Sequence, residues 1–206
     1  MNQRLQYCLV LLLLFLGYSG KAQVFTEDTT TRAPFFAAKK FDSKCFVGIE
    51  AVPTQILKNK AAMNTGLSLN WVINHRFVVS AKYYVLTTPV NIAGSLEPVR
   101  TDTVNLFHQS AALAFGYIFF DKKRFSLHPE LTVGWGMAKY TLLAKTSRSD
   151  FAVIIPAIYG VYNATKYFRL GLGLNYRATA GVSLGGLKSS DLNGIGGVIF
   201  IRVGTF

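Results

Sequence analysis

Apolar residues occupy every second position through most of this sequence after residue 45. The pattern is clearest at 125–138, where the even positions are polar or small and the odd positions are Phe125, Leu127, Pro129, Leu131, Val133, Trp135 and Met137. A period of two is typical of a β-strand whose two faces meet different environments. Four further stretches repeat it, at 66–73, 77–85, 112–119 and 168–177, and three alternate less cleanly, at 45–57, 151–163 and 194–206. Together these stretches predict eight strands.

The second face of these stretches indicates which side meets lipid. Glycine, alanine and serine crowd it, with an occasional lysine, arginine or glutamate. Such a face suits the narrow polar interior of a small barrel whose apolar face touches the membrane. We therefore predict an all-β fold, an eight-stranded antiparallel up-and-down transmembrane β-barrel. The predicted lipid-facing residues include Leu67, Leu69, Trp71, Leu131, Val133, Trp135, Leu170, Leu172 and Leu174.

The connections between the stretches support a barrel that crosses a membrane. Short turns are expected at 74–76, 121–124 and 163–166, and they alternate with longer links near 57–62, 87–103, 143–150 and 178–193. Outer-membrane barrels have short periplasmic turns and longer extracellular loops. Aromatic residues are expected to form girdles at both interfaces: Trp71, Phe77, Phe119, Phe125, Phe168 and Phe206 by the short turns, and Tyr83, Tyr84, Phe107, Tyr140, Phe151 and Tyr176 toward the long loops.

The first 44 residues differ from the rest of the chain. Segment 1–22 has a positive start at Arg4, an apolar run from Cys8 to Leu16 and a small-residue cleavage site at its end, as in a cleaved signal peptide. A retained anchor is the alternative, but the apolar run is short for a spanning helix. Segment 23–44 is polar and is interpreted as a periplasmic arm, and 45–206 as the barrel.

On these residues the chain resembles the small eight-stranded outer-membrane barrels of Gram-negative bacteria, of the OmpX and OmpA-barrel type, and particularly the short barrels of Bacteroidota. The resemblance covers 45–206 and rests on the alternation, the signal that ends at Ala22, and the terminal Phe206. It implies an outer-membrane location. It also implies that Phe206 is the assembly signal that the barrel assembly machinery reads, although the steps of two before it, through Gly204 and Arg202, only partly keep the usual pattern.

An eight-stranded barrel is just wide enough inside to be filled by side chains, so a porin is not expected. Buried charges are tolerable only when they are paired. We therefore predict a lumenal ion-pair network that fixes the barrel shape, with a proton or substrate path as the alternative. Its expected members are Glu50, Lys82, Glu130, Arg169 and Arg177.

One arrangement could carry chemistry. His108 and Ser110 share a strand face and could act as base and nucleophile, with His128 and Glu130 one strand later. The spacing resembles the His-x-Ser of the PagL type of lipid A deacylase, whose site faces lipid, whereas the alternation here turns both residues inward. A polar plug is therefore the preferred interpretation. No metal-ligand spacing and no phosphate loop occurs in the sequence, so neither metal nor cofactor is expected.

The formal net charge of +12 raises the question of nucleic acid. The basic residues are spread along the chain, and the densest mature run, Lys122 to Arg124, lies in an expected periplasmic turn beside phenylalanines. Such cations reach anionic lipid head groups. We therefore expect outer-membrane lipid, including lipopolysaccharide, as a partner and no nucleic acid. Loop cations that could meet outer-leaflet phosphates are Lys58, Lys60, Arg100, Lys145, Arg148 and Lys188.

The leading functional hypothesis is a non-enzymatic structural or interaction protein that displays the 87–103 and 178–193 loops outside the cell. A second is a barrel subunit of a larger envelope complex for secretion or conjugation, docked through 23–44. A third is a lipid A-modifying enzyme, and a fourth is a soluble periplasmic barrel that binds an apolar ligand. The fourth requires the two faces to be exchanged, and a one-residue slip would exchange them at the first and sixth strands, whose register the pattern leaves open.

Overall fold

The computed structural model describes residues 43–57, 60–92, 104–120, 124–142, 145–184 and 187–205. The predicted signal peptide 1–22, almost all of the predicted arm 23–44 and the predicted assembly signal Phe206 lie outside the described residues. The first strand begins at Ser43, inside the segment interpreted as the arm. In the described part of the chain, no helix is long and apolar enough to cross a membrane.

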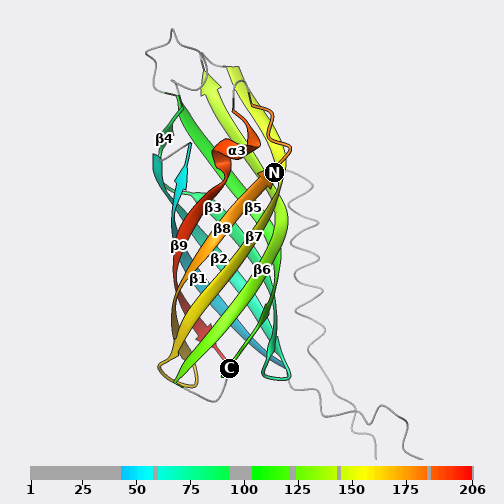
Figure 1. Ribbon diagram of the computed structural model, residues 1–206, viewed down its shortest axis with the longest axis vertical. Coiled ribbons are helices and arrows are strands. Elements are labelled where there is room, and N and C mark those ends of the chain that lie inside the picture. Colours follow the sequence, from blue (N-terminus) through cyan, green and yellow to red (C-terminus); the bar gives the residue numbers. More distant parts are fainter. Residues whose placement is uncertain are drawn as a thin grey trace, which may run out of the picture. The chain divides into compact units, whose positions relative to one another are not determined.

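Eight long strands form the described structure, with one two-residue strand and one short helix between them (Figure 1). The long strands are β1 Ser43–Ile56, β2 Lys60–Ile73, β3 Phe77–Leu86, β5 Asn105–Tyr117, β6 Phe125–Leu142, β7 Lys145–Asn163, β8 Phe168–Ala180 and β9 Gly194–Gly204. The minor elements are β4 Val90–Asn91 and α3 Ser189–Leu192. Each of the eight predicted stretches falls within one long strand or overlaps it, so the eight-strand prediction is confirmed.

The strands form a closed barrel. Each long strand pairs antiparallel with the strand before and after it in the chain, and the pairs β1–β9 and β3–β5 complete the ring. Closure leaves no unpaired edge among the long strands, which is the condition that a spanning sheet must meet in lipid. The predicted antiparallel up-and-down barrel is confirmed, and its strands are visibly tilted in Figure 1.

Two of the expected longer links are wrong. Strand β2 already starts at Lys60, and β6 and β7 stay paired out to Leu142 and Lys145, so the expected links near 57–62 and 143–150 shorten to residues 57–59 and 143–144. The apolar outer face ends before these positions, and hydroxyls continue the pairing there, with Thr141 Oγ1 3.1 Å from Thr146 Oγ1. The backbone ladder therefore persists where the hydrophobic signal stops. The two long connections, which contain β4 and α3, leave the same end of the barrel (Figure 1).

The register of β1 and β7 is set by the structure. In β1 the even positions from Phe46 to Ile56 are buried, and the odd positions are exposed or half-buried. In β7 the inward face itself carries large apolar side chains, namely Phe151, Val153, Ile155, Tyr159 and Val161. Both faces of β7 are thus apolar, and this explains why its sequence alternates weakly.

The expected aromatic girdles are confirmed in part. Trp71, Phe77, Phe119 and Phe125 lie exposed on the outer face near the short-turn end. Tyr83 and Tyr176 are also exposed, on the half that leads to the long connections. Tyr84, Tyr140 and Phe151 instead point inward and are buried, so their assignment to a girdle is wrong. Tyr84 and Tyr140 share strand parity with the inward Lys82 and Ala138, and alternation requires them to face the lumen.

Inward glycines make room for inward aromatic rings on the neighbouring strand. Four directly opposed pairs show this: Gly66 and Tyr84, Gly136 and Phe151, Gly171 and Phe200, and Gly173 and Tyr159. A Cβ added at Gly171 would lie 1.9 Å from Phe200 Cζ, and one added at Gly136 would lie 2.2 Å from Phe151 Cζ. The small residues of the inner face, which indicated a narrow lumen, are therefore covered by aromatic rings from the neighbouring strands.

Candidate functional site in the barrel lumen

Three of the predicted network residues meet inside the barrel. Lys82 of β3 lies between two carboxylates, with its Nζ 3.1 Å from Glu50 Oε1 of β1 and 2.6 Å from Glu130 Oε1 of β6. Lysine and both glutamates are buried. An ammonium between two carboxylates offsets part of the cost of removing the three charges from water. The cluster was predicted to fix the barrel shape. Its contacts link three strands, as that role requires.

Neutral hydroxyls also donate hydrogen bonds to the carboxylates. The Tyr84 hydroxyl donates to Glu50 Oε2 at 2.6 Å, and the Tyr159 hydroxyl donates to Glu130 Oε1 at 3.0 Å. Thr132 Oγ1 donates to the same Glu130 oxygen at 3.3 Å. Four strands thus supply side chains to one buried network, because Tyr159 comes from β7. Such a network specifies which strands lie opposite one another across the lumen.

Arg202 of β9 is a member that the sequence reasoning missed. Its guanidinium nitrogen lies 3.8 Å from Glu50 Oε1, and its guanidinium carbon lies 3.9 Å from the centre of the Phe200 ring and 5.3 Å from that of Phe46. Aromatic faces attract a guanidinium electrostatically. Strand parity could have found it, since Arg202 alternates with the apolar Ile201 and Val203.

Arg177, one of the two predicted arginines of β8, makes no ion pair with the carboxylates around Lys82. Arg177 is buried, and its Nε donates a 2.8 Å hydrogen bond to the Leu192 carbonyl at the end of α3. Among the described residues no carboxylate lies within ion-pair distance of Arg177. Arg169 is half-buried near the short-turn end, opposite Arg202 in the β8–β9 register. Membership of Arg169 in the network stays a prediction.

A second polar cluster lies toward the short-turn end of the lumen. Ser80 Oγ donates to Asn70 Oδ1 at 2.6 Å, and Asn70 Nδ2 donates to Ser68 Oγ at 3.0 Å. Between these groups and the short turns, the lumen is filled by an apolar cluster of Phe46, Val72, Val78 and Ile118. The interior is thus occupied from the central ion pairs to the short turns.

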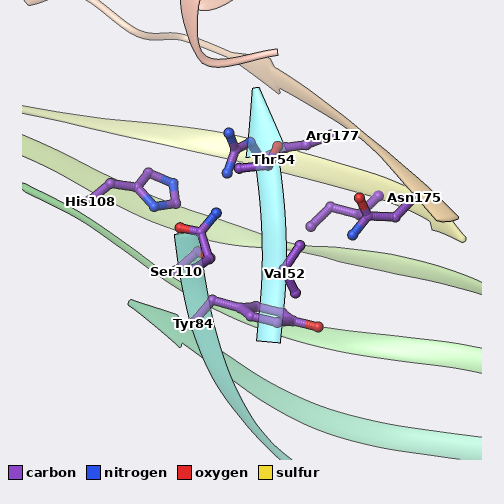
Figure 2. A pocket seen from close by; sticks show the side chains of 9 residues that line it. Val52, Thr54, Tyr84, His108, Ser110, Asn175 and Arg177 are labelled. Atoms are coloured by element: carbon purple, nitrogen blue, oxygen red, sulfur yellow. The ribbon is translucent and has the colours of Figure 1, made fainter. Parts of the chain in front are cut away.

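A small cavity with polar and apolar side chains in its lining lies between the central network and the long connections. Its volume is about 20 Å³, and it is lined by Val52, Thr54, Asn64, Tyr84, His108, Ser110, Ile155, Asn175 and Arg177. In the view of Figure 2, His108 and Ser110 lie on one side of it and Arg177 and Asn175 on the other. A cavity of this size accepts about one water-sized species.

His108 is the least satisfied group in this cavity. It is 3% exposed, and neither ring nitrogen has a hydrogen-bond partner among the described residues. Its ring stacks on Phe151, with centroids 5.3 Å apart and planes inclined by 18°. Asn64 Oδ1 is likewise buried with no hydrogen-bond partner. The predicted pair of His108 and Ser110 therefore faces one cavity, but no hydrogen bond joins base to hydroxyl.

His128, the other histidine of the hypothetical catalytic set, lies elsewhere. Its Nε2 is 3.1 Å from Ser126 Oγ of its own strand, and both residues are buried. Glu130 is engaged by Lys82 and Tyr159, as described above. The structure thus keeps the four residues of that hypothesis in separate hydrogen-bond environments. Within the described ranges no group of three or more histidine, cysteine, aspartate or glutamate side chains is arranged to hold a metal ion.

The long connection from β8 to β9 folds over the lumen. Its residues Val182, Leu184, Leu187 and Leu192 are buried in one apolar cluster with Phe151, Tyr140 and Leu86 of the strands. Hydrogen bonds hold it there, as Thr179 Oγ1 donates to the Ser189 carbonyl at 2.9 Å and the Leu57 amide donates to the Asp191 carbonyl at 2.6 Å. The expectation that 178–193 is a displayed loop is therefore wrong for its apolar residues. They are buried because the strand ends beside the long connections form an apolar opening, and covering it removes apolar surface from water.

The predicted lipid-facing residues lie on the outer surface of the barrel. Eight of the nine are exposed, from Trp71 at 36% to Trp135 at 77%, and Leu69 is half-buried. Their neighbours on the same face include Ile154, Ile158, Ile199 and Ile201, which are also exposed. A wall of exposed aliphatic side chains of this kind is unfavourable in water and suits hydrocarbon.

Solved structures with this architecture are outer-membrane barrels. The structure of Neisserial surface protein A matches with a TM-score of 0.60 and 12% sequence identity, and the match covers 82% of this chain and 100% of that one. Ail, the attachment invasion locus protein of Yersinia pestis, in complex with the heparin analogue sucrose octasulfate, matches with a TM-score of 0.51 and 12% identity, over 80% of this chain and 97% of that one.

Sequence comparison adds nothing to these likenesses, because neither the protein-family models nor the curated proteins match this chain. At 12% identity the two structures are informative about fold alone. The chain has the fold of the small eight-stranded outer-membrane β-barrels, and the resemblance inferred from its alternation is confirmed at that level.

Proposed function

We propose that this protein is an integral outer-membrane barrel with a closed lumen that acts as a structural or interaction protein. In this proposal the outer wall holds the barrel in the bilayer, and the end with the long connections faces the outside of the cell. Outer-membrane barrels place their longer loops there. The likeness to solved outer-membrane barrels supports the location.

The observation that carries this proposal is the filling of the lumen along its height. From the short turns upward there are an apolar cluster, the buried ion pairs, a cavity of about 20 Å³ and an apolar cover formed partly by the β8–β9 connection. A diffusion pore needs a continuous aqueous channel. Porins provide one with about 16 or more strands, roughly twice the number in this barrel. A closed barrel must act through its surfaces.

The lipid A-modifying hypothesis receives little support from the geometry. His108 and Ser110 are buried inside the barrel, whereas the acyl chains of a membrane lipid would lie against the outer wall. A general base must also reach the proton that it abstracts, and no hydrogen bond joins the two side chains. The polar-plug interpretation accounts for both facts. Comparison of lipid A from cells with the wild type and Ser110→Ala would expose an enzyme.

For partners we propose outer-membrane lipid, including lipopolysaccharide, together with the barrel assembly machinery. Lys60 of β2, Arg148 of β7 and Lys188 of the β8–β9 connection are exposed at the end assigned to the outside, where lipopolysaccharide phosphates would lie. Since Ail was crystallised with a heparin analogue, sulfated saccharides form a second anionic ligand class to include in binding tests. A partner protein in a larger envelope complex remains the alternative proposal.

The proposal is tested by fractionation and conductance. The expressed full chain is fractionated, the membrane pellet is washed with urea, and the detergent extract is run on a gel with and without boiling. Purified barrel is then added to a planar lipid bilayer. We expect retention in the outer membrane, a heat-dependent shift in mobility and no stable channels.

Other results would change the assignment in defined ways. Release of the protein into the soluble periplasm would overturn the membrane proposal and revive the soluble ligand-binding barrel. Stable channels of uniform conductance would overturn the closed lumen. Co-purification of a stoichiometric partner that is lost when residues 23–44 are deleted would favour the envelope-complex alternative over an independent barrel.

A further inference from the structure

The upper lumenal cavity holds a buried cation without a compensating carboxylate. Arg177 is 7% exposed, and its Nε is occupied by the Leu192 carbonyl. Within the described part of the chain no carboxylate pairs with it, since Glu50 contacts Lys82 and Arg202, and Glu130 contacts Lys82. A buried guanidinium is costly unless a negative charge or a full set of acceptors surrounds it.

The same cavity is lined by hydrogen-bond donors, and one of them, His108, has no partner among the described residues. One nitrogen of a neutral imidazole always carries a proton, so the unpartnered His108 ring supplies at least one unused N–H donor. Ser110 and Asn175 line the cavity with a hydroxyl and an amide. Asn64 Oδ1 has no partner, and a half-turn of the amide brings Nδ2, a donor, to the same place. These groups converge with Arg177 on one small space.

We propose that this cavity is a binding site for a small monovalent anion of halide size, held by Arg177 and His108. Charge decides between an anion and a water molecule. Water can accept from His108 and from the guanidinium, but it leaves the positive charge of Arg177 uncompensated. A halide accepts the same hydrogen bonds and also neutralises the cation in a region of low dielectric.

The size of the cavity selects the class of anion. About 20 Å³ is space for one water-sized or halide-sized species, so sulfate, phosphate, gluconate and the head groups of lipids are too large. The apolar cover that contains Leu184 and Leu192 lies above it, and the central ion pairs lie below. The bound ion would thus link β1, β2, β5 and β8 at the level where the cover is attached.

The first test is the stability of the mature chain in detergent micelles. Urea unfolding is followed by tryptophan fluorescence at constant ionic strength, with sodium chloride replaced stepwise by sodium gluconate. Because a ligand that binds only the folded state stabilises it by mass action, the unfolding equilibrium constant should fall about tenfold for each tenfold rise in chloride above the dissociation constant. Sodium bromide should act as chloride does.

Variants identify the site. Arg177→Met removes the charge while keeping much of the side-chain volume, and it should abolish the difference between chloride and gluconate. Arg148→Met is the matched control, because Arg148 is exposed and ion-paired with Asp150 at 2.9 Å, and it should keep the full chloride response. An equal chloride response in wild type and Arg177→Met would overturn the site.

A direct observation keeps the proposal falsifiable if Arg177→Met does not fold. Crystals of the wild-type barrel grown in sodium bromide should show an anomalous scattering peak between the Arg177 guanidinium and the His108 ring. An ordered water there without anomalous signal would overturn the proposal, as would stabilities that are equal in chloride and gluconate. Neither result would affect the closed-lumen proposal, whose tests are fractionation and conductance.

Discussion

Single residues determine how the barrel carries charge in its interior. In the described part of the chain, Lys82 is the only ion-pair partner that the two carboxylates Glu50 and Glu130 share. Its removal would leave two buried negative charges near one another, with the Tyr84 hydroxyl and the more distant Arg202, at 3.8 Å, still beside Glu50. Lys82 is therefore the residue on which the central network most depends.

We expect Lys82→Met to lower the free energy of unfolding by about 3 to 5 kcal/mol, the range observed when one partner of a buried ion pair is removed. Urea unfolding in micelles measures the change. The triple variant Glu50→Gln, Lys82→Met and Glu130→Gln should recover part of the loss, because it removes the uncompensated charges as well. Lys188→Met, at an exposed position, is the control, and an equal effect there would contradict the buried-charge account.

Glycine is required on the inner face where a ring from the neighbouring strand lies over it. We expect Gly171→Ala to lower the free energy of unfolding by about 1 to 3 kcal/mol, because the added Cβ would lie 1.9 Å from Phe200 Cζ and the packed ring must move. Gly160→Ala is the matched control, since its Cβ would meet only the Leu172 carbonyl, at 3.8 Å. Combining Gly171→Ala with Phe200→Leu should restore stability relative to Gly171→Ala alone if ring overlap is the cause.

At the scale of elements, the connection from β8 to β9 behaves as part of the core. Its short helix α3 is a single turn, but Leu192 at its end is 1% exposed, and Asn193 Oδ1 accepts from the Thr179 amide at 2.7 Å. Apolar burial and hydrogen bonds to the strands together hold the segment over the lumen. It should therefore resist proteases that cut exposed loops.

We expect Leu192→Ala to destabilise the cover by about 2 to 5 kcal/mol, the usual cost of truncating a buried leucine. Limited proteolysis of the folded barrel should then cut within residues 181–193 faster than in wild type, whereas the exposed control Ser190→Ala should be cut at the wild-type rate. Rapid cutting of the wild type in this segment would show that the cover is not closed in solution.

At the scale of the whole molecule, the direction of the two faces decides between a membrane barrel and a soluble one. Leu172 lies in the middle of β8 and is 66% exposed on the outer wall. In phospholipid vesicles, Leu172→Arg should cost about 2 to 4 kcal/mol of folding free energy, as a cation at the bilayer midplane does.

The control for this prediction is a residue on the same outer face that lies at a different depth in the membrane. Leu127 lies on the same outer face near the start of β6, beside the short turns, and Leu127→Arg should cost only about 0 to 1 kcal/mol because the side chain reaches the interface. A soluble barrel would tolerate both substitutions equally. Equal, small effects at the two positions would therefore contradict the membrane-embedded outer wall.

Much of the fold could be predicted from the sequence because alternation is a local property. Once Leu131 and Val133 are assigned to one face, Glu130 and Thr132 must lie on the other, and the same reasoning correctly orients Lys82 and His108. The ends of strands were harder to predict. Strands β6 and β7 continue beyond their apolar outer face, and backbone pairing there needs no hydrophobic pattern.

Strand number, the direction of each clear strand and the polar character of the lumen are therefore determined by the sequence alone. Only the tertiary structure decided which inward groups meet. Glu50, Lys82 and Glu130 come together and Arg177 does not, because the level at which strands face one another across the lumen depends on register and tilt. The cover over the lumen was also decided by the tertiary structure. In the sequence its apolar residues are separated by polar ones and show no pattern. Packing over the lumen brings these apolar residues into one core: Val182, Leu184, Leu187 and Leu192.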